Sequence, residues 1–517
     1  MLFNSYEFIF AFLPITLLVY FLIGRARDQR LALGWLLLAS LFFYAWWKPA
    51  NLWIIIFSVC FNYGMARYCI HRADPLRRKW FLAFGIAANL GLLGYFKYAN
   101  FFVENWNELG GPTVLLPRIV LPIAISFFTF QQIVFLVEAY RGEAGDYDFL
   151  HYALLVTFYP HLIAGPIVHY REMLTQFTRP NATRFRPSHF SVGVTIFCIG
   201  LFKKVVMADG VAPFANSIFD AAAGGASLTP HEAWTGALAY TFQLYFDFSG
   251  YSDMAIGLAR MIGIRFPMNF NSPYKSINII DFWRRWHITL SRFLRDYLYI
   301  PLGGNRRGRV RRYANLLITM LLGGLWHGAG WTFVIWGGLH GIYLVINNAW
   351  HALREQLGFT RPVPMGRAVA RALTFVCAVI AWVFFRAQGF AAAHTMLSAM
   401  FAGSAAVTGA TVAGHPVLRQ VGLVERWFPH DLLDPYNAIG WIAVLGLIAW
   451  LGPNTQQIMA RYRPVLEHRA IDAMARRYRW LQWRPTYAWS AMAALLSAAA
   501  LVTLWIGRNA DFIYFQF

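Results

Sequence analysis

Long apolar segments alternate with short polar or basic segments along the whole chain of 517 residues. Each apolar segment has about 17–25 residues, which is enough to cross roughly 30 Å of hydrocarbon as an α-helix. The ten-residue alternation of outer-membrane barrel strands is absent. The pattern predicts helical spans at 8–23, 31–47, 52–70, 80–97, 119–140, 190–208, 234–260, 313–350 (a broken pair), 368–386, 436–452 and 486–506. We therefore expect an all-α polytopic membrane protein, a bundle of roughly 11–12 transmembrane helices with re-entrant and interfacial helices.

The composition agrees with a lipid environment. The chain is 58% hydrophobic and only 13% charged, whereas soluble domains carry about 25% charged residues. Its net charge is +21, but the basic residues lie in loops between spans, which indicates orientation and contact with anionic lipids. Nucleic acid is therefore not an expected partner. The cysteines lie in apolar segments without metal-ligand spacing, so we expect buried thiols; they are Cys60, Cys69, Cys198 and Cys377.

The distribution of basic residues predicts an orientation. The N-terminal MLFNSYEFIFAFLPITLLVYFLIGRARDQR has Lys or Arg only after its apolar run, the reverse of a secretory signal, so we expect a retained first span with its N-terminus outside. Every basic loop then lies in the cytoplasm, and 210–233, without Lys or Arg, lies outside. This layout requires TFYPHLIAGPIVHY (157–170), which prolines break, to be a re-entrant hairpin. The small residues of 402–415 predict a flexible outer loop.

The segment 265–312 is strongly basic, with eleven Lys or Arg against two Asp. Within DFWRRWHITLSRFLRDYLYI (281–300), the apolar positions leave a basic face, which predicts an amphipathic helix at the cytoplasmic interface. This face consists of Arg284, Arg285, Arg292 and Arg295. It would either anchor the chain to anionic lipid or bind an anionic cytosolic donor, such as the phosphates of a nucleotide-bearing thioester. His287 in this helix is either a packing residue or a functional one.

Two histidines, His327 and His340, lie in the otherwise uncharged LLGGLWHGAGWTFVIWGGLHG (321–341). After Arg312 the apolar run YANLLITMLLGGL (313–325) has only thirteen residues, and we expect Gly323-Gly324 to interrupt the helix. His327 is therefore predicted to lie deep in the membrane at a break between helices. The glycines would admit a second backbone or a thin substrate. On one straight helix the two imidazoles would point about 220° apart, so no metal site is expected. We favour a functional cavity for His327 and a hydrogen bond between helices for His340.

A second polar cluster lies in LYFDFSGYSDMAIGLARMIG (244–263). Asp247 with Tyr251, and Ser249 with Asp253, form i, i+4 pairs on opposite helix faces. A carboxylate inside a membrane needs a partner or a wet cavity. The two aspartates therefore either shape a substrate path or bond to neighbouring helices, and we favour the second interpretation.

Three motifs in this order resemble the membrane-bound O-acyltransferase (MBOAT) family, most of all its bacterial alginate O-acetylation branch. They are YFDFSGYSDMAIGLARMIG, FNSPYKSINIIDFWRRWHITLSRFLRDYLYIPLGGNRRG and LLGGLWHGAGWTFVIWGGLHG. The N-terminal MLFNSYEFIFAFLPITLLVYF and the YFKYANFF at 95–102 are also similar. The resemblance covers essentially the whole chain.

The resemblance implies one membrane-embedded domain over 1–517 with a central funnel. Its catalytic core would be about 119–350, between N-terminal helices 1–118 and C-terminal helices 351–517. It also implies acyl transfer from a thioester to a hydroxyl, with the catalytic histidine at His327 and a second functional histidine at His287. No role for His340 follows. Further candidates for a substrate path or donor binding are Arg284, Arg285, Trp326, Asp247, Asp253 and Asn305.

The same resemblance implies partners and a location. The donor substrate would be acetyl-CoA or an acyl-carrier thioester, with no tightly bound cofactor. The partners would be membrane lipids, an extracytoplasmic SGNH-type acetyltransferase and a polysaccharide synthesis and secretion complex in the bacterial inner membrane. The acetylated polymer stays open between alginate, cellulose, peptidoglycan and teichoic acid. A transporter of a lipid-linked sugar is the alternative from another class, although no inverted repeat is visible.

The predicted orientation can be tested by cysteine labelling. In a variant whose native cysteines are replaced by serine, Arg25→Cys, Arg78→Cys and Arg477→Cys should react with an impermeant maleimide only after cells are permeabilised, because basic loops stay cytoplasmic. Ala226→Cys, in the segment without Lys or Arg, should be labelled in intact cells. Labelling of any of the three arginine positions in intact cells would overturn the layout.

Overall fold

The structure is a computed structural model, in which every regular element is a helix within the residues it describes. Those residues are 1–26, 28–71, 74–143, 148–179, 182–358, 364–402, 435–467, 471, 475–507 and 512–513. The predicted outer loop at 402–415 therefore lies outside the described residues, apart from Ala402. The all-helical fold class is confirmed.

Six helices in the described part of the chain are long and apolar enough to cross a membrane, by length and composition. They are Glu7–Arg25, Pro49–Ile70, Pro75–Glu108, Pro187–Ala223, Gly366–Arg386 and Tyr487–Trp505. Each coincides with a span that the apolar pattern predicts. Three shorter apolar helices are Gln29–Ala45, Phe390–Phe401 and Asn437–Leu451. The count of 11–12 crossings stays a prediction.

Most of these spans are composite helices, in which α-helical pieces join without a loop. The first comprises a π-helical turn (Glu7–Phe12) and α1 (Leu13–Arg25), and the second contains α3 (Leu52–Gly64). The third comprises α4 (Pro75–Leu93), a π-helical turn, η4 (Gly94–Tyr98), and α5 (Ala99–Glu108). The fourth comprises α10 (Pro187–Phe202), a second π-helical turn, η5 (Lys203–Ala208), and α11 (Asp209–Ala223). The remaining two contain α17 (Pro364–Arg386) and α22 (Tyr487–Trp505), and the shorter ones are α2 (Gln29–Ala45), α18 (Phe390–Phe401) and α19 (Pro435–Leu451).

The other predicted spans correspond to four helices outside these two sets. They are α6 (Ile125–Arg141), α12 (Pro230–Met261), α15 (Gly308–His327) and α16 (Trp331–Gln356). Helix α12 is buried along nearly its whole length, and α6 is buried on all sides. The prediction for 119–140 began too early, because residues 112–122 are irregular and Leu115 is 90% exposed.

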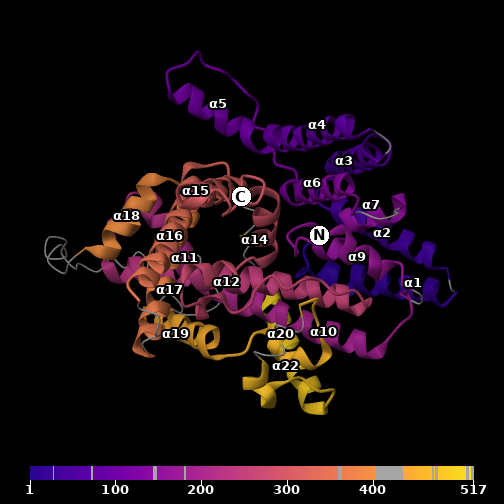
Figure 1. Ribbon diagram of the computed structural model, residues 1–517. Coiled ribbons are helices and arrows are strands. Elements are labelled where there is room, and N and C mark those ends of the chain that lie inside the picture. Colours follow the sequence, from indigo (N-terminus) through magenta and orange to yellow (C-terminus); the bar gives the residue numbers. More distant parts are fainter. Residues whose placement is uncertain are drawn as a thin grey trace.

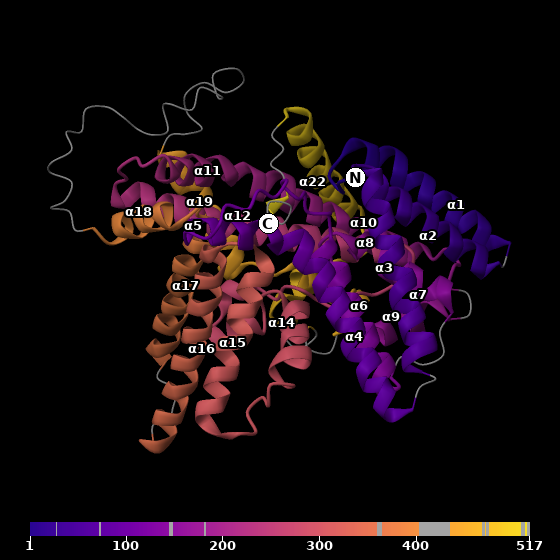
Figure 2. The same ribbon diagram turned by 90° about the horizontal axis from the view of Figure 1, so that it is seen from above.

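Helix α12 runs through the middle of the molecule (Figure 1). The N-terminal helices α1 to α4 lie on one side of it, and α15 to α18 lie on the other side. Figure 2 shows α15, α16 and α17 side by side. The middle helix, α16, contacts both α15 and α17. Of this bundle, α17 contacts α12, and on the N-terminal side α12 contacts the short α8 (Tyr159–Leu162), which packs against α2.

Glycines bring α10 and α12 into backbone contact. A Cβ atom on Gly200 would lie 2.7 Å from the carbonyl oxygen of Gly250, and one on Gly250 would lie 2.8 Å from that of Gly200. Gly193 and Gly257 repeat this arrangement, with 2.6 and 2.7 Å. Real Cβ atoms essentially never approach so closely. Small residues on both helices are typical of membrane helix packing, which relies on close van der Waals contact.

Irregular backbone is buried between α7 (Phe149–Thr157) and α9 (Tyr170–Phe177). Residues 152–168 are all buried, with only the short α8 (Tyr159–Leu162) between the two helices. This confirms that the proline-broken segment is enclosed by protein, as backbone without regular hydrogen bonding must be. Its re-entrant path stays a prediction.

The prediction of buried thiols is wrong. Cys60 is exposed, and Cys69, Cys198 and Cys377 are only half-buried. They lie on apolar helices, but an apolar helix that faces lipid exposes part of its surface outside the protein. Apolar sequence alone therefore does not distinguish a protein interior from a lipid-facing position.

The α10–α12 contact predicts the effect of a larger residue. Gly250→Leu should lower the free energy of unfolding by about 1–3 kcal/mol or more, because the side chain forces two backbones apart. The measurement is the melting temperature of the purified protein in detergent. Gly91→Leu is the matched control, because Gly91 lies on the exposed side of α4 with open space around it. Equal melting temperatures for the two variants would contradict the packing argument.

Candidate functional site

Helix α15 carries His327 as its last residue. The helix runs through Gly323 and Gly324 without interruption, so the prediction that these glycines break it is wrong. A Cβ on Gly324 would lie 3.1 Å from the Cα of Gly337, so the glycine provides close packing against α16 instead. The helix ends because Gly328 is extended, at φ −155° and ψ 146°. His327 therefore lies at a break between helices, as predicted.

His287 faces His327, with 6.4 Å between the two ring centroids. It lies between the short helices α13 (Ile279–Trp283) and α14 (Ile288–Leu294), in the left-handed region at φ +42°. The continuous amphipathic helix predicted for 281–300 is therefore wrong. The physical reason is a competing backbone pairing, in which Ile288 N donates to Asn269 O at 2.9 Å. This pairing turns the His287 ring inward, where it is fully buried.

Asn269 fixes the orientation of His287. Its Oδ1 lies 3.1 Å from His287 Nδ1 and accepts from Thr289 Oγ1 at 2.9 Å. Its amide nitrogen donates to Ser252 Oγ at 3.2 Å. Because the amide oxygen is an acceptor, Nδ1 carries the proton, and in the neutral ring Nε2 holds the lone pair. Neutral His287 is thus an acceptor at Nε2, and it would stabilise an oxyanion only in its protonated form.

Aromatic rings enclose the His327 imidazole. The ring centroids of Trp326, Trp336 and Phe385 lie 4.9, 5.0 and 5.3 Å from it. Phe248 and Phe270 lie 4.8 and 6.4 Å from the His287 ring. Such walls keep bulk water from the imidazoles and strengthen any electrostatic interaction between them and a substrate.

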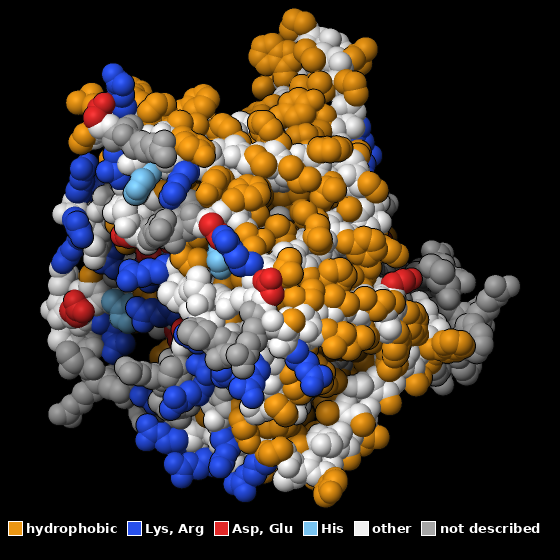
Figure 3. Space-filling model, turned by 90° about the vertical axis from the view of Figure 1, so that its right-hand side faces the viewer, with side chains coloured by type: hydrophobic (Ala, Val, Ile, Leu, Met, Phe, Trp, Pro, Cys, Tyr) orange, Lys and Arg blue, Asp and Glu red, His pale blue; other side chains and the backbone are white. Residues whose placement is uncertain are grey.

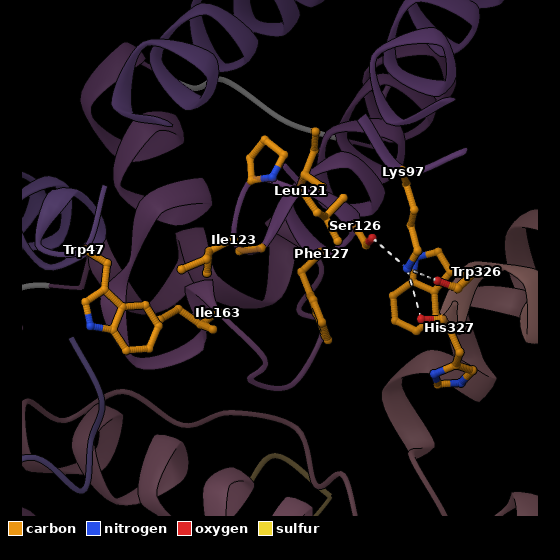
Figure 4. A pocket seen from close by; sticks show the side chains of 12 residues that line it. Trp47, Lys97, Leu121, Ile123, Ser126, Phe127, Ile163, Trp326 and His327 are labelled. Carbon is orange, nitrogen blue, oxygen red and sulfur yellow. Dashed lines mark hydrogen bonds between the residues drawn. The ribbon is translucent and has the colours of Figure 1, made fainter. Parts of the chain in front are cut away.

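A cavity of about 180 Å³ borders His327 (Figure 4). Its walls come from segments that are far apart in the sequence. They are Trp47, Lys97, residues 121–127, Ile163, Trp326 and His327. The side chains are mostly apolar, with the Lys97 ammonium and the Ser126 hydroxyl beside the end of α15. The cavity gives small molecules a place next to the histidine.

Lys97 binds the end of α15, a role that the sequence pattern did not indicate. Its ammonium donates to the carbonyl oxygens of Trp326 at 2.6 Å and His327 at 3.0 Å, and Ser126 Oγ lies at 3.5 Å. Tyr98 donates to Leu325 O at 2.8 Å. A cation on the last carbonyls of a helix satisfies free acceptors and the negative end of the helix dipole. The available signal was a lone lysine in the apolar YFKYANFF.

Asp247 and Asp253 bond to neighbouring elements, as favoured from the sequence. Asp247 pairs with Lys204 at 2.7 Å and accepts from the backbone N–H of Ile513 at 3.2 Å. Asp253 pairs with Lys203 at 2.8 Å, and it accepts from Thr455 Oγ1 at 2.6 Å and Gln456 Nε2 at 2.9 Å. Both carboxylates therefore tie α12 to η5 and to C-terminal segments.

The remaining candidates fall into two groups. Trp326 lines the cavity beside His327. Arg284 and Asn305 are exposed, and Arg285 pairs with Asp281 at 2.8 Å. These three do not line the cavity that borders His327, so a part in donor binding stays a prediction.

His340 is fully buried and sits against the rings of Phe282, Trp283 and Trp336, at 5.9, 5.1 and 4.9 Å. Within the described part of the chain, neither of its ring nitrogens has a hydrogen-bond partner. The expected hydrogen bond between helices is therefore wrong, because the helices around His340 present aromatic rings to it.

Comparison with protein families gives one match over more than half of the chain. Residues 106–390 match the model described as MBOAT, membrane-bound O-acyltransferase family. His287 and His327 lie inside this region, whereas Lys97 lies just before it.

Curated relatives extend the similarity over the full length. The chain is 40% identical to the probable alginate O-acetylase AlgI of Pseudomonas aeruginosa, over 100% of both chains. It is 46% identical to the peptidoglycan O-acetyltransferase of Helicobacter pylori, over 77% of this chain and 80% of that protein. It is 29% identical to the teichoic acid D-alanyltransferase of Bacillus subtilis, over 48% of this chain and 65% of that protein.

The role of Lys97 can be tested with a neutral side chain of similar length. Lys97→Met should lower the turnover of acyl transfer by about 10- to 100-fold, because a displaced helix end misplaces His327. Lys97→Arg should restore part of the activity, since it keeps the positive charge. Lys79→Met is the matched control, because Lys79 is exposed on α4 of the same composite helix. Unchanged turnover in folded Lys97→Met would show that the contact does not position His327.

Proposed function

The chain belongs to the membrane-bound O-acyltransferase family, and on that premise we propose that it acetylates an exported polysaccharide. The donor is a cytosolic thioester, acetyl-CoA, and the acetyl group crosses the membrane without the rest of the donor. The observation that carries this proposal is the pair of buried histidines, whose ring centroids lie 6.4 Å apart and of which His327 borders a cavity.

His327 is the proposed general base. A hydroxyl oxygen of the acceptor attacks the thioester carbonyl carbon while the imidazole takes the hydroxyl proton. The tetrahedral oxyanion then collapses, the C–S bond breaks, and the proton passes from the imidazolium to the departing thiolate. A positioned base of this kind contributes about 10²–10⁴-fold. His287, with its lone pair on Nε2, is the second histidine of the site and accepts a hydrogen bond from the reacting groups.

The cavity is the proposed entrance for the acceptor. Trp47 follows α2, and residues 121–127 lead into α6. The distribution of basic loops favours an N-terminus outside the cell. In that orientation, Trp47 and residues 121–127 lie at the extracytoplasmic ends of their helices. Donor and acceptor would then reach His327 from opposite sides, the donor from the cytoplasm and the acceptor through the cavity.

Alginate is the first candidate polymer, since the similarity to the probable alginate O-acetylase covers both chains completely. Peptidoglycan is the second, since the peptidoglycan O-acetyltransferase of Helicobacter pylori has the higher identity over a shorter alignment. We place the chain in a bacterial inner membrane with an SGNH-type acetyltransferase and a polysaccharide synthesis and secretion complex as partners. The family match to acyltransferases speaks against the transporter alternative.

Mutation of His327 tests the chemistry. His327→Ala should reduce the O-acetyl content of the exported polymer by about 10²–10⁴-fold in a host that lacks the native gene, while the membrane level of the protein is unchanged. The measurement is acetate released from the polymer by mild alkali. His231→Ala is the matched control, since His231 is exposed at the start of α12. Near-normal acetylation with His327→Ala would refute its assignment as base.

A further inference from the structure

A second cavity, of about 140 Å³, is lined by five arginines and by His189. The arginines come from three places, the residues after α9, the start of α10 and the segment that ends α12. They are Arg179, Arg184, Arg186, Arg260 and Arg265. No Asp or Glu is among the lining residues, and no other part of the chain that the structure describes gives any of the five an ion pair.

Arg260 lies in the last turn of α12 and is only 4% exposed. Its Nε has no hydrogen-bond partner among the described residues. A buried charge without a partner is costly, so proteins normally pair it or give it a ligand. Positive neighbours increase this cost, because the guanidiniums of Arg265 and Arg186 lie close enough to repel that of Arg260. The arrangement concentrates positive charge around an empty volume.

The backbone around this cavity is held in place independently of any ligand. Gln176 donates to Arg265 O at 3.0 Å and accepts from Arg265 N at 2.9 Å. Gly263, at φ +88°, lets the chain turn directly after α12. The cavity is thus a built feature, with Arg260 in the interior and Arg179, Arg184 and Arg186 exposed at its rim.

From these observations we propose that the arginine cavity binds a phosphate group. Guanidinium forks match phosphate oxygens two at a time, and several forks at fixed positions select a multiply charged anion over a carboxylate. The cavity volume of about 140 Å³ is ample for one phosphate group, because a single water molecule occupies only about 30 Å³ in liquid water. Lys and Arg side chains gather along one edge of the molecule in Figure 3, and hydrophobic side chains cover the middle of that view.

Two kinds of molecule present a phosphate group at a basic membrane face. One is a phosphate of the coenzyme A part of the donor, which rests on the proposed function and would give the donor a docking point separate from the histidines. The other is the phosphodiester of an anionic lipid such as phosphatidylglycerol. Both sources use the same arginines, so one set of variants distinguishes them.

The test uses the purified full chain in nanodiscs and two binding measurements. In the first, the Kd for coenzyme A is compared with that for pantetheine, which lacks the nucleotide phosphates. In the second, native mass spectrometry counts phosphatidylglycerol and phosphatidylcholine retained after delipidation. The variants are Arg260→Gln and Arg184→Gln, with Arg309→Gln as the matched control, because Arg309 is exposed near the start of α15 and outside the cavity.

A donor site predicts that both variants weaken coenzyme A binding about tenfold, the loss expected for one charged hydrogen bond, with pantetheine binding unchanged. A lipid site predicts loss of phosphatidylglycerol alone. If Arg260→Gln does not fold, Arg184→Gln at the exposed rim decides. Binding of both probes as in the wild type overturns the proposal. Because neither measurement needs turnover, a failure of the proposed acetyl transfer would show separately, as a folded wild type that binds but does not react.

Discussion

Hydrogen bonding of polar groups among apolar helices is the constraint on which this structure depends. Water is absent from the hydrocarbon region, so a carboxylate, an ammonium or a helix end there must find its partner within the protein. Asp247 finds Lys204, and Asp253 finds Lys203 together with two side chains of a distant segment. Each such partnership joins two elements, and together they place α12 at the centre.

The same constraint shapes the histidine site. The end of α15 leaves carbonyl oxygens without intrahelical partners, and Lys97 supplies the missing donors. His287 lies on a strained left-handed backbone, which is maintained by the hydrogen bonds around Asn269. The site thus consists of two helix interruptions, each stabilised by a polar side chain from a different part of the chain.

π-Helical turns recur next to these polar contacts. Lys97 lies in η4, and Lys203 and Lys204 lie in η5. A π-helical turn adds a residue within a helix and changes the direction of the side chains that follow, and such turns are frequent at functional sites. In this protein they let long apolar helices present a lysine inward without ending the helix. Apolar length for the membrane and a polar contact for the site thus coexist in one element.

The distribution of charge divides the molecule into regions with different tasks. The cavity beside His327 is mostly apolar. Its one ammonium group, that of Lys97, already donates hydrogen bonds to the end of α15. The arginine cavity has no carboxylate among its lining residues. Chemistry that moves a proton benefits from the first environment, because fixed groups replace water. Recognition of an anion benefits from the second, because several guanidiniums share its charge.

The sequence by itself determined the fold class and most span positions, and it supplied the two candidate histidines. Apolar length is a local property and predicts a membrane helix without further information, and the motifs around His287 and His327 point to them directly. Only the tertiary structure decided that α13 and α14 are separate, that Lys97 and Asn269 complete the site, and that five arginines meet at one cavity. These features depend on contacts between segments far apart in the chain. The periodicity of a single segment does not contain them, because it reports which side of a helix is apolar and not what lies against that side.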